Sequence, residues 1–279
     1  MKIFENHTQL KEFLQSNREQ ISFVPTMGNL HEGHISLVET AKGLSQTVVC
    51  SIFVNPTQFS ANEDFATYPK TLEKDLQKLE KAGVSAVYIP SVKDIYPTKS
   101  TLNFDIPHLT KCLCGISRPH FFNGVMTVVL KFLIQVQPRF LILGEKDFQQ
   151  FLVVKSMVES IGLPVDVISS PIIRNENGLA LSSRNGYFAS LKIPEKINGI
   201  LFDFAQNVKI NGIENAFFEA KKSLNFLDEI DYLEVRSSAD LSLYQGGDFS
   251  EYRLFFAGTI DRVRLIDNIS LANFQTQNE

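Results

Sequence analysis

The sequence has little cysteine and little excess of either charge. Its 279 residues include three cysteines, Cys50, Cys112 and Cys114, too few for the disulfide framework of a small secreted domain and typical of a reducing compartment. The 27 basic and 31 acidic side chains leave a net charge of −4. A broad basic surface for DNA or RNA is therefore not expected, and an anionic ligand must be bound by a few local basic groups.

The sequence also lacks a hydrophobic run long enough to span a bilayer. The longest apolar-rich stretch, residues 125–136, is interrupted by Lys131 and is too short. Residues 1–6 lack the apolar core of a signal peptide. With 44% apolar and 21% charged residues, the composition is that of a folded globular protein. We therefore expect a cytoplasmic protein without a membrane-spanning segment.

Two hydrophobic periods alternate along the first two thirds of the chain. Helices that alternate with strands are typical of βαβ units in a parallel sheet. The pattern predicts an α/β fold in which a doubly wound, Rossmann-like parallel sheet occupies residues 1–172. Apolar residues at helical spacing predict helices at residues 10–14, 35–41, 72–79, 125–132 and 148–161, and short apolar runs predict strands at residues 21–24, 48–54, 84–89, 140–143 and 165–168.

The rhythm changes after residue 172. Helices followed by grouped strands predict a smaller α+β domain over residues 173–279, which could close over a ligand as a lid. The loop from Asn55 to Lys70 is a second candidate cover, because loops of that length in compact domains are often functional. In the C-terminal part, helix-like stretches at residues 194–208 and 213–225 precede strand-like segments at 231–236, 253–257 and 262–266.

Polar residues follow the first predicted strand of the parallel sheet, at the edge where ligands bind in such folds. This segment runs from Pro25 to His34 and leads into a helix. Gly28 and Gly33 permit a tight turn, and the helix N-terminus offers free N–H groups to an anion. His31 and His34 face the same side and can donate to phosphate oxygens, with solvent-facing or capping histidines as the alternative. A zinc-protease site is disfavoured, because its histidines are four residues apart.

Amides and a lysine follow two further strands. Asn55 and Gln58 come after the second strand, where they can recognise a small hydroxy acid or simply form a turn. Lys146 comes after the fourth strand, close to a helix N-terminus, where the helix dipole disfavours a cation. A lysine at that place indicates a phosphate bound between the lysine and the helix. An exposed lysine beside Glu145 and Asp147 is the alternative.

A third candidate for phosphate binding is Ser182-Ser183-Arg184, with two hydroxyls and a guanidinium, although two serines before a helix are also a common cap. The common phosphate loops, Gly-x-x-x-x-Gly-Lys-Ser/Thr and Gly-x-Gly-x-x-Gly, are missing. A zinc site from His108, Cys112, Cys114 and His120 is disfavoured. The Cys-x-Cys spacing is tighter than that of zinc sites, and there is no second cysteine pair.

These segments, in this order, resemble the pantothenate synthetase (pantoate–β-alanine ligase) family of the HIGH-type nucleotidyltransferase superfamily. They span residues 25–268, nearly the whole chain, and several are long enough to be specific to the family. The matching stretches are Pro25-Thr26-Met27-Gly28-Asn29-Leu30-His31-Glu32-Gly33-His34, Ser51-Ile52-Phe53-Val54-Asn55-Pro56-Thr57-Gln58-Phe59, Tyr68-Pro69-Lys70-Thr71, Ser117-Arg118-Pro119, Gly144-Glu145-Lys146-Asp147-Phe148-Gln149-Gln150, Gly178-Leu179-Ala180-Leu181-Ser182-Ser183-Arg184-Asn185 and Arg264-Leu265-Ile266-Asp267-Asn268.

The resemblance implies an ATP-dependent ligase with a nucleotidyltransferase-type fold. In this reaction pantoate attacks the α-phosphorus of ATP and pyrophosphate leaves. The amine of β-alanine then attacks the resulting pantoyl adenylate, giving pantothenate and AMP. The implied partners are these small molecules and a second copy of the chain in a homodimer. Mg²⁺ is expected to be carried with ATP.

The resemblance also implies roles for individual residues. His34 is the implied proton donor, and His31, Lys146 and Arg184 are implied to act on the phosphates. Pantoate and β-alanine are implied to bind at Gln58 and Gln150, in a pocket that Asn55 and Tyr68 line. The residues implied to bind ATP are Met27, Gly28, Asn29, Leu30, His31, Glu32, Gly33, His34, Gly144, Glu145, Lys146, Asp147, Ile173, Leu181, Ser182, Ser183 and Arg184.

Two departures from the family pattern stand out. The family usually has Arg-Pro-x-His-Phe-x-Gly-Val, whereas here Phe121 occupies the histidine position and His120 lies one place earlier. The acidic cluster that some members show after Tyr-Pro-x-Thr is reduced to Glu73-Lys74-Asp75. A protein-bound Mg²⁺ site at that segment is therefore not expected.

Two other functions remain open on the sequence alone. One is a nucleotidyltransferase that leaves the nucleotide on its product, and the other is a nucleotide-binding or assembly protein without turnover. The amide pairs Asn55/Gln58 and Gln149/Gln150 favour a small hydroxy-acid substrate. The presence together of His31, His34, Lys146 and Arg184 favours catalysis.

Overall fold

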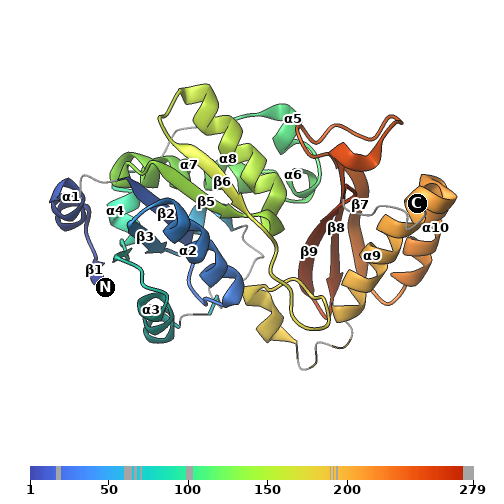
Figure 1. Cartoon of the computed structure of the whole chain (residues 1–279), viewed down its shortest axis with the longest axis horizontal. Coiled ribbons are helices and arrows are strands. Elements are labelled where there is room, and N and C mark those ends of the chain that lie inside the picture. The colour runs from blue at the N-terminus through green and yellow to red at the C-terminus, as the bar shows by residue number, and fades with distance from the viewer. Residues whose placement is uncertain are drawn as a thin grey trace.

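The main sheet has six parallel strands in the order β1-β4-β3-β2-β5-β6 (Figure 1). The computed structural model describes residues 1–16, 20–59, 65, 68–69, 71–98, 103–188, 190, 192 and 194–272. The strands are β1 (Lys2–Phe4), β2 (Ile21–Thr26), β3 (Thr47–Ile52), β4 (Ala86–Tyr88), β5 (Phe140–Gly144) and β6 (Asp166–Ser170). The helices that accompany them are α1 (His7–Ser16), α2 (Glu32–Leu44), α3 (Leu72–Lys81), α4 (Val92–Ile95), α5 (Pro107–Thr110), α6 (Cys114–Ser117), α7 (Phe121–Val136) and α8 (Phe148–Ile161).

Helices cover both faces of this sheet, which explains the continuous apolar runs in its central strands. Phe23, Val49 and Leu141 point to the face packed by α1, α7 and α8. The alternate residues, such as Val24 and Cys50, point to the face packed by α2 and α3. The predicted doubly wound sheet is therefore confirmed. Among the described residues up to 172, the elements not predicted are β1, the four-residue helices α4, α5 and α6, and the 3₁₀ helices at Pro56–Gln58 and Glu145–Asp147, because such short segments show no hydrophobic period.

The strand order reverses beside β2. The chain passes from β2 to β3 and β4 on one side, and then crosses back to place β5 on the other side of β2. The carboxyl ends of β2 and β5 therefore lie next to each other at a switch point, where ligands bind in open parallel sheets. The loop before α2 and the turn before α8 begin at these two ends.

A second, antiparallel sheet in the order β7-β8-β9 follows, with two helices on its outer side (Figure 1). Its elements are α9 (Pro194–Asn211), α10 (Ile213–Ser223), β7 (Glu229–Ser237), β8 (Tyr252–Ile260) and β9 (Val263–Ser270). Leu233, Leu254 and Phe256 pack under α9 and α10, whereas Tyr232 and Phe255 pack on the core of the first sheet. The smaller α+β unit is confirmed. The boundary after residue 172 stays a prediction. Among the described residues no helix combines the length and apolar character that crossing a membrane requires.

Candidate active site

A cavity of about 680 Å³ lies at the carboxyl ends of β2 and β5. Its wall includes residues of the first sheet, of the segment 171–187 and of the second sheet. His34, Lys146 and Arg184, which are far apart in the sequence, line this one cavity. Sixteen residues expected at the site lie on its wall: Met27, His31, Gly33, His34, Asn55, Gln58, Tyr68, Gly144, Lys146, Asp147, Gln150, Ile173, Leu181, Ser182, Ser183 and Arg184.

Five residues implied to bind ATP are not part of this wall: Gly28, Asn29, Leu30, Glu32 and Glu145. Leu30 is 3% exposed and packs in the core beside α2, whereas Glu32 is exposed on the first turn of that helix. The Glu145 carboxylate is paired with Arg253. A direct contact of any of these five residues with ATP stays a prediction.

The loop after β2 is held by a buried carboxylate. Asp75, on α3 and 2% exposed, accepts the backbone N–H groups of Asn29 (2.9 Å) and Leu30 (2.8 Å). It also accepts the Thr71 hydroxyl at 3.1 Å. These contacts fix a turn in which Gly28 (φ 84°) and Asn29 (φ 51°) have left-handed backbones. Both carboxylate oxygens therefore have protein donors, and whether this acidic segment holds Mg²⁺ stays a prediction.

The two histidines cap the helix that follows. The Gly33 N–H donates to His31 Nδ1 at 3.1 Å, and the His31 N–H donates to His34 Nδ1 at 3.3 Å. Because each Nδ1 accepts a hydrogen bond, the proton of each neutral ring is on Nε2. The capping alternative and the ligand-binding interpretation are thus compatible, since capping leaves one N–H donor on each ring.

Both imidazoles are neutral at physiological pH. Burial is the main cause that lowers the pKa of His31 to about 4 and that of His34 to about 3. The ammonium of Lys146 lowers both further, which places positive charge close to both rings. The wall therefore offers neutral N–H donors beside a lysine.

These shifted pKa values predict a loss of stability at mildly acidic pH. Between about pH 6.5 and about pH 4 the unfolded histidines bind protons that the folded ones do not, so the free energy of unfolding falls as the pH falls. The limiting slope is about 1.4 kcal/mol per pH unit for each histidine. Urea unfolding at about pH 7 and about pH 5 checks this. The His31→Gln/His34→Gln variant should show a smaller decrease than the wild type, whereas the exposed His108→Gln should match the wild type. Equal decreases in all three proteins would contradict the assignment.

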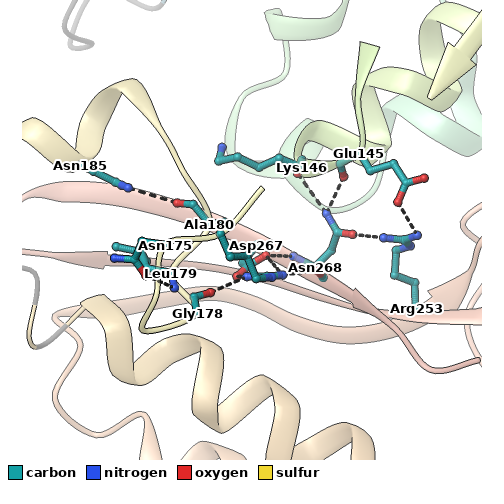
Figure 2. Close-up of polar contacts among 11 residues, drawn as sticks. Glu145, Lys146, Asn175, Gly178, Leu179, Ala180, Asn185, Arg253, Asp267 and Asn268 are labelled. Carbon is teal, nitrogen blue, oxygen red and sulfur yellow. Dashed lines mark hydrogen bonds and ion pairs between the residues drawn. The ribbon is translucent and has the colours of Figure 1, made fainter. Parts of the chain in front are cut away.

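The segment with the two serines contacts the loop after β2 directly. The Ser183 hydroxyl donates to the Asn29 carbonyl (3.2 Å), and the Asn29 carboxamide donates to the Ser183 carbonyl (3.2 Å). The Ser182 hydroxyl accepts the Arg184 N–H at 3.3 Å, as the capping alternative expected. Figure 2 shows the neighbouring bond from the Asn185 carboxamide to the Ala180 carbonyl (3.1 Å). These contacts bring Arg184 to the same cavity as the histidines.

Of the side-chain amides that follow the strands, some are fully engaged with the protein and others are available to a substrate. Asn55 is 1% exposed; its carboxamide donates to the Gly124 carbonyl and to Gln58 Oε1, both at 3.2 Å, and accepts the Tyr96 hydroxyl at 2.8 Å. Asn55 therefore orients Gln58, which itself lines the cavity. The carboxamide of Gln149 similarly binds backbone groups of residues 109–114, so Gln150 is the member of that pair suited to a substrate.

The start of α7 shows how the departure from the family pattern is accommodated. Phe121 lines the cavity, and the Arg118 guanidinium lies 3.8 Å from the centre of its ring. His120 is exposed and is not part of the wall. His120 therefore does not take the place of the family's histidine, and this position presents an aromatic ring to the cavity.

The second sheet contributes Tyr232, which the sequence analysis did not name, and Arg264, which it named only as part of a segment that matches the family. Tyr232 and Arg264 line the cavity, and both contact Cys114, with the Tyr232 hydroxyl 3.1 Å from Sγ. Their positions depend on docking of one sheet against the other, which no local pattern reveals. The described residues contain no group of three or more histidine, cysteine or acidic side chains placed to hold a metal ion.

The fold and the cavity define a nucleotide-binding α/β protein of the nucleotidyltransferase type. The family model described as pantoate-beta-alanine ligase matches residues 2–270. A pantothenate synthetase from Idiomarina loihiensis is 40% identical over 282 residues, covering 98% of this chain and 99% of that protein. One from Shewanella loihica is 41% identical, covering 94% and 95%. The chain belongs to the pantoate–β-alanine ligase family, a family of enzymes, which confirms the resemblance.

Solved structures agree with this assignment. The pantothenate synthetase of Thermus thermophilus is 37% identical, with a TM-score of 0.92, and the match covers 97% of this chain and 99% of that one. The pantoate-beta-alanine ligase of Francisella tularensis, complexed with beta-gamma ATP and beta-alanine, is also 37% identical, with a TM-score of 0.82 and coverage of 97% and 98%. The nucleotidyltransferase-type fold is thereby confirmed.

Proposed function

We propose that this protein condenses pantoate with β-alanine through a pantoyl adenylate, with cleavage of ATP to AMP and pyrophosphate. The observation that carries the proposal is the placement of His34, Lys146 and Arg184 on one cavity wall in a member of this family. A product that keeps its nucleotide, which the sequence left open, finds no support in the family assignment.

In the first step a carboxylate oxygen of pantoate attacks the α-phosphorus of ATP. The new bond joins this oxygen to phosphorus, and the bond from the α-phosphorus to the bridging oxygen breaks with its electron pair leaving on pyrophosphate. Donors that face the leaving group stabilise this growing charge more than they stabilise bound ATP. Lys146 and Arg184 supply positive charge, and His31 and His34 supply N–H donors.

His34 acts as a hydrogen-bond donor through Nε2 rather than as a reservoir of a titratable proton. Its pKa of about 3 in the free protein leaves the ring neutral, and the bond at Nδ1 fixes the tautomer. A neutral ring suits a site that already holds the Lys146 ammonium, because a second nearby cation would be costly when ATP is absent.

Pantoate binds between Gln58 and Gln150, whose amides can pair with hydroxyl and carboxylate groups without adding charge. The Gln58 carboxamide is held by Asn55 and lies 3.1 Å from the sulfur of Met27. Tyr68, which is 6% exposed, lines the same region. The amine of β-alanine then attacks the adenylate carbonyl, forming the amide bond and releasing AMP.

Mg²⁺ enters the site bound to ATP, so the metal is part of the substrate. Asp75 already accepts backbone donors, and this agrees with a metal carried by the phosphates.

The acyl adenylate hydrolyses in water, so the site has to be covered during turnover. We assign residues 173–279 as the lid, because the second sheet supplies part of the wall. Half of the second expected cover, the loop from Asn55 to Lys70, lies outside the described residues, which include 55–59, 65 and 68–69.

A homodimer and a cytoplasmic location complete the proposal. The homodimer comes from the resemblance, and light scattering in solution tests it. The location agrees with three buried free thiols, Cys50, Cys112 and Cys114.

The test is exchange of labelled pyrophosphate into ATP, followed by release of AMP. Exchange that requires pantoate, and AMP release that requires β-alanine, are the expected results. Exchange without pantoate would replace the proposal with another adenylyl transfer, and no exchange at all would favour a binding protein without turnover.

His34→Ala should lower pantoate-dependent exchange at least about tenfold, which corresponds to about 1.4 kcal/mol, because one donor to the leaving group is lost. His108→Ala, an exposed change, serves as the control, and circular dichroism checks that both variants fold. A near-normal rate in a folded His34→Ala protein would remove His34 from the mechanism.

A further inference from the structure

Asn268 joins the second sheet to the turn that carries Lys146. It lies on β9 with 2% of its surface exposed. Its carboxamide nitrogen donates to the carbonyl of Glu145 at 2.9 Å and to the carbonyl of Lys146 at 3.0 Å (Figure 2). Both hydrogens of the amide are therefore used on consecutive residues of one turn, although these residues are more than 120 positions away in the sequence.

Arg253, on the neighbouring strand β8, fixes which way this amide points. Its guanidinium donates to Asn268 Oδ1 and, at 3.2 Å, to the Glu145 carboxylate. A guanidinium can only donate, so the amide oxygen must face Arg253 and the amide nitrogen must face the turn. The other carboxylate oxygen of Glu145 accepts the Ser169 hydroxyl at 3.0 Å. The backbone and the first side chain of the turn are thus held by three separate segments.

The turn itself, Glu145–Asp147, is a short 3₁₀ turn without a side-chain cap of its own at its N-terminus. It begins at the carboxyl end of β5, and Lys146 projects from it onto the cavity wall. Its direction is therefore set by the carbonyl contacts to Asn268 as well as by β5 and α8. A lysine has a long and mobile side chain, so fixing its backbone limits where the ammonium can reach.

We propose that Asn268, oriented by Arg253, is a positioning residue that sets the Lys146 ammonium against the polyphosphate of ATP. This inference rests on the proposed function of Lys146. It implies that the lysine reaches its working position only when the second sheet is docked on the first. The phosphate site is then complete only while the second sheet is docked on the first. When the second sheet is undocked, the reaction of ATP with pantoate is suppressed.

Asn268→Asp tests this with almost no change of shape. The oxygen that faces Arg253 is kept, while the amide nitrogen is replaced by an oxygen that faces two carbonyl oxygens. We expect kcat for pantoate-dependent exchange to fall by about tenfold to a hundredfold, because a displacement of about 1 Å can have an effect of that size. The KM for pantoate should change less than about threefold. Asn268→Ala, which introduces no charge, should act in the same direction.

A double-mutant cycle separates positioning from simple support of the fold. If Asn268 acts through Lys146, Asn268→Asp should change the rate by less than about twofold when Lys146 is already alanine. A structural role would give the same factor with either residue at position 146. The matched control is Ser270→Ala, two residues along the same strand and on the same face, outside the cavity wall. It should leave exchange unchanged.

Affinity for nucleotides gives a second readout. Asn268→Asp should weaken binding of ATP at least about fivefold and leave binding of adenosine unchanged, because Lys146 faces the phosphates. Three results would overturn this inference without affecting the proposed function. They are an equal loss of affinity for ATP and adenosine, additive effects of the two substitutions on the exchange rate, and wild-type exchange rates in both Asn268 variants. A harmless Lys146→Ala would overturn the role of Lys146 in the proposed function, and the inference with it.

Discussion

Replacing Lys146 with alanine is expected to lower the rate of pantoate-dependent pyrophosphate exchange by about a hundredfold or more. Removing one preorganised donor from a developing anion has an effect of that size, about 2.7 kcal/mol. Lys146 lies on the cavity wall with about a fifth of its side chain exposed, and its charge is felt by both His31 and His34. The Lys146 ammonium is therefore close enough to the two histidines for all three side chains to contact the same polyphosphate.

The control for this experiment is Lys155→Ala on the following helix, α8. The Lys155 side chain is 48% exposed and faces Glu159, so its loss should change exchange by less than about twofold. Lys146→Arg is an informative third variant, because it keeps the charge but not the shape of the donor, and an intermediate rate is expected. A Lys146→Ala enzyme that retains more than about a third of the wild-type rate would exclude Lys146 from the catalytic step.

Replacing Asp75 with alanine is expected to destabilise the protein by about 3 kcal/mol or more and to abolish most exchange activity. The change leaves the N–H groups of Asn29 and Leu30 without the buried charged acceptor that now holds them, and each such loss costs about 1 to 3 kcal/mol. The left-handed backbone of Asn29, which costs energy in a residue other than glycine, then has less to hold it. The loop that leads to His31 and His34 should relax, so activity falls even in the fraction that stays folded.

Urea unfolding and exchange measured at saturating ATP follow these two effects separately. Glu73→Ala is the matched control, because Glu73 is an exposed carboxylate in the same turn of α3. It should be within about 0.5 kcal/mol of the wild type. The structure also predicts that the milder Asp75→Asn leaves the Mg²⁺ concentration for half-maximal exchange unchanged. A large shift in that concentration would show that Asp75 binds the metal instead of the loop.

Much of the site could be predicted because parallel strands place their carboxyl ends at one edge of a sheet. The segments with His31, His34 and Lys146 each follow a strand, so a correct list of strands already places them near one another. Residues 182–184 were a candidate from their hydroxyls and guanidinium alone, and the resemblance strengthened this candidate, although only a long irregular segment connects them to the sheet. The same local reasoning could not predict that the Asn55 side chain is buried and orients Gln58. Its burial depends on packing against α7, where its carboxamide donates to the Gly124 carbonyl.

The sequence by itself determined the alternation of strands and helices, the candidate phosphate-binding segments and the family of this protein. Hydrophobic periods and short motifs are local, so they are visible without coordinates. Only the tertiary structure decided that Asp75 holds the loop after β2, that Phe121 and not His120 faces the cavity, and that Asn268 contacts the turn of Lys146. The physical reason is that the hydrophobic period of a strand shows which face of the sheet a side chain lies on. Which residue of the other sheet that side chain contacts depends on how the two sheets pack against each other.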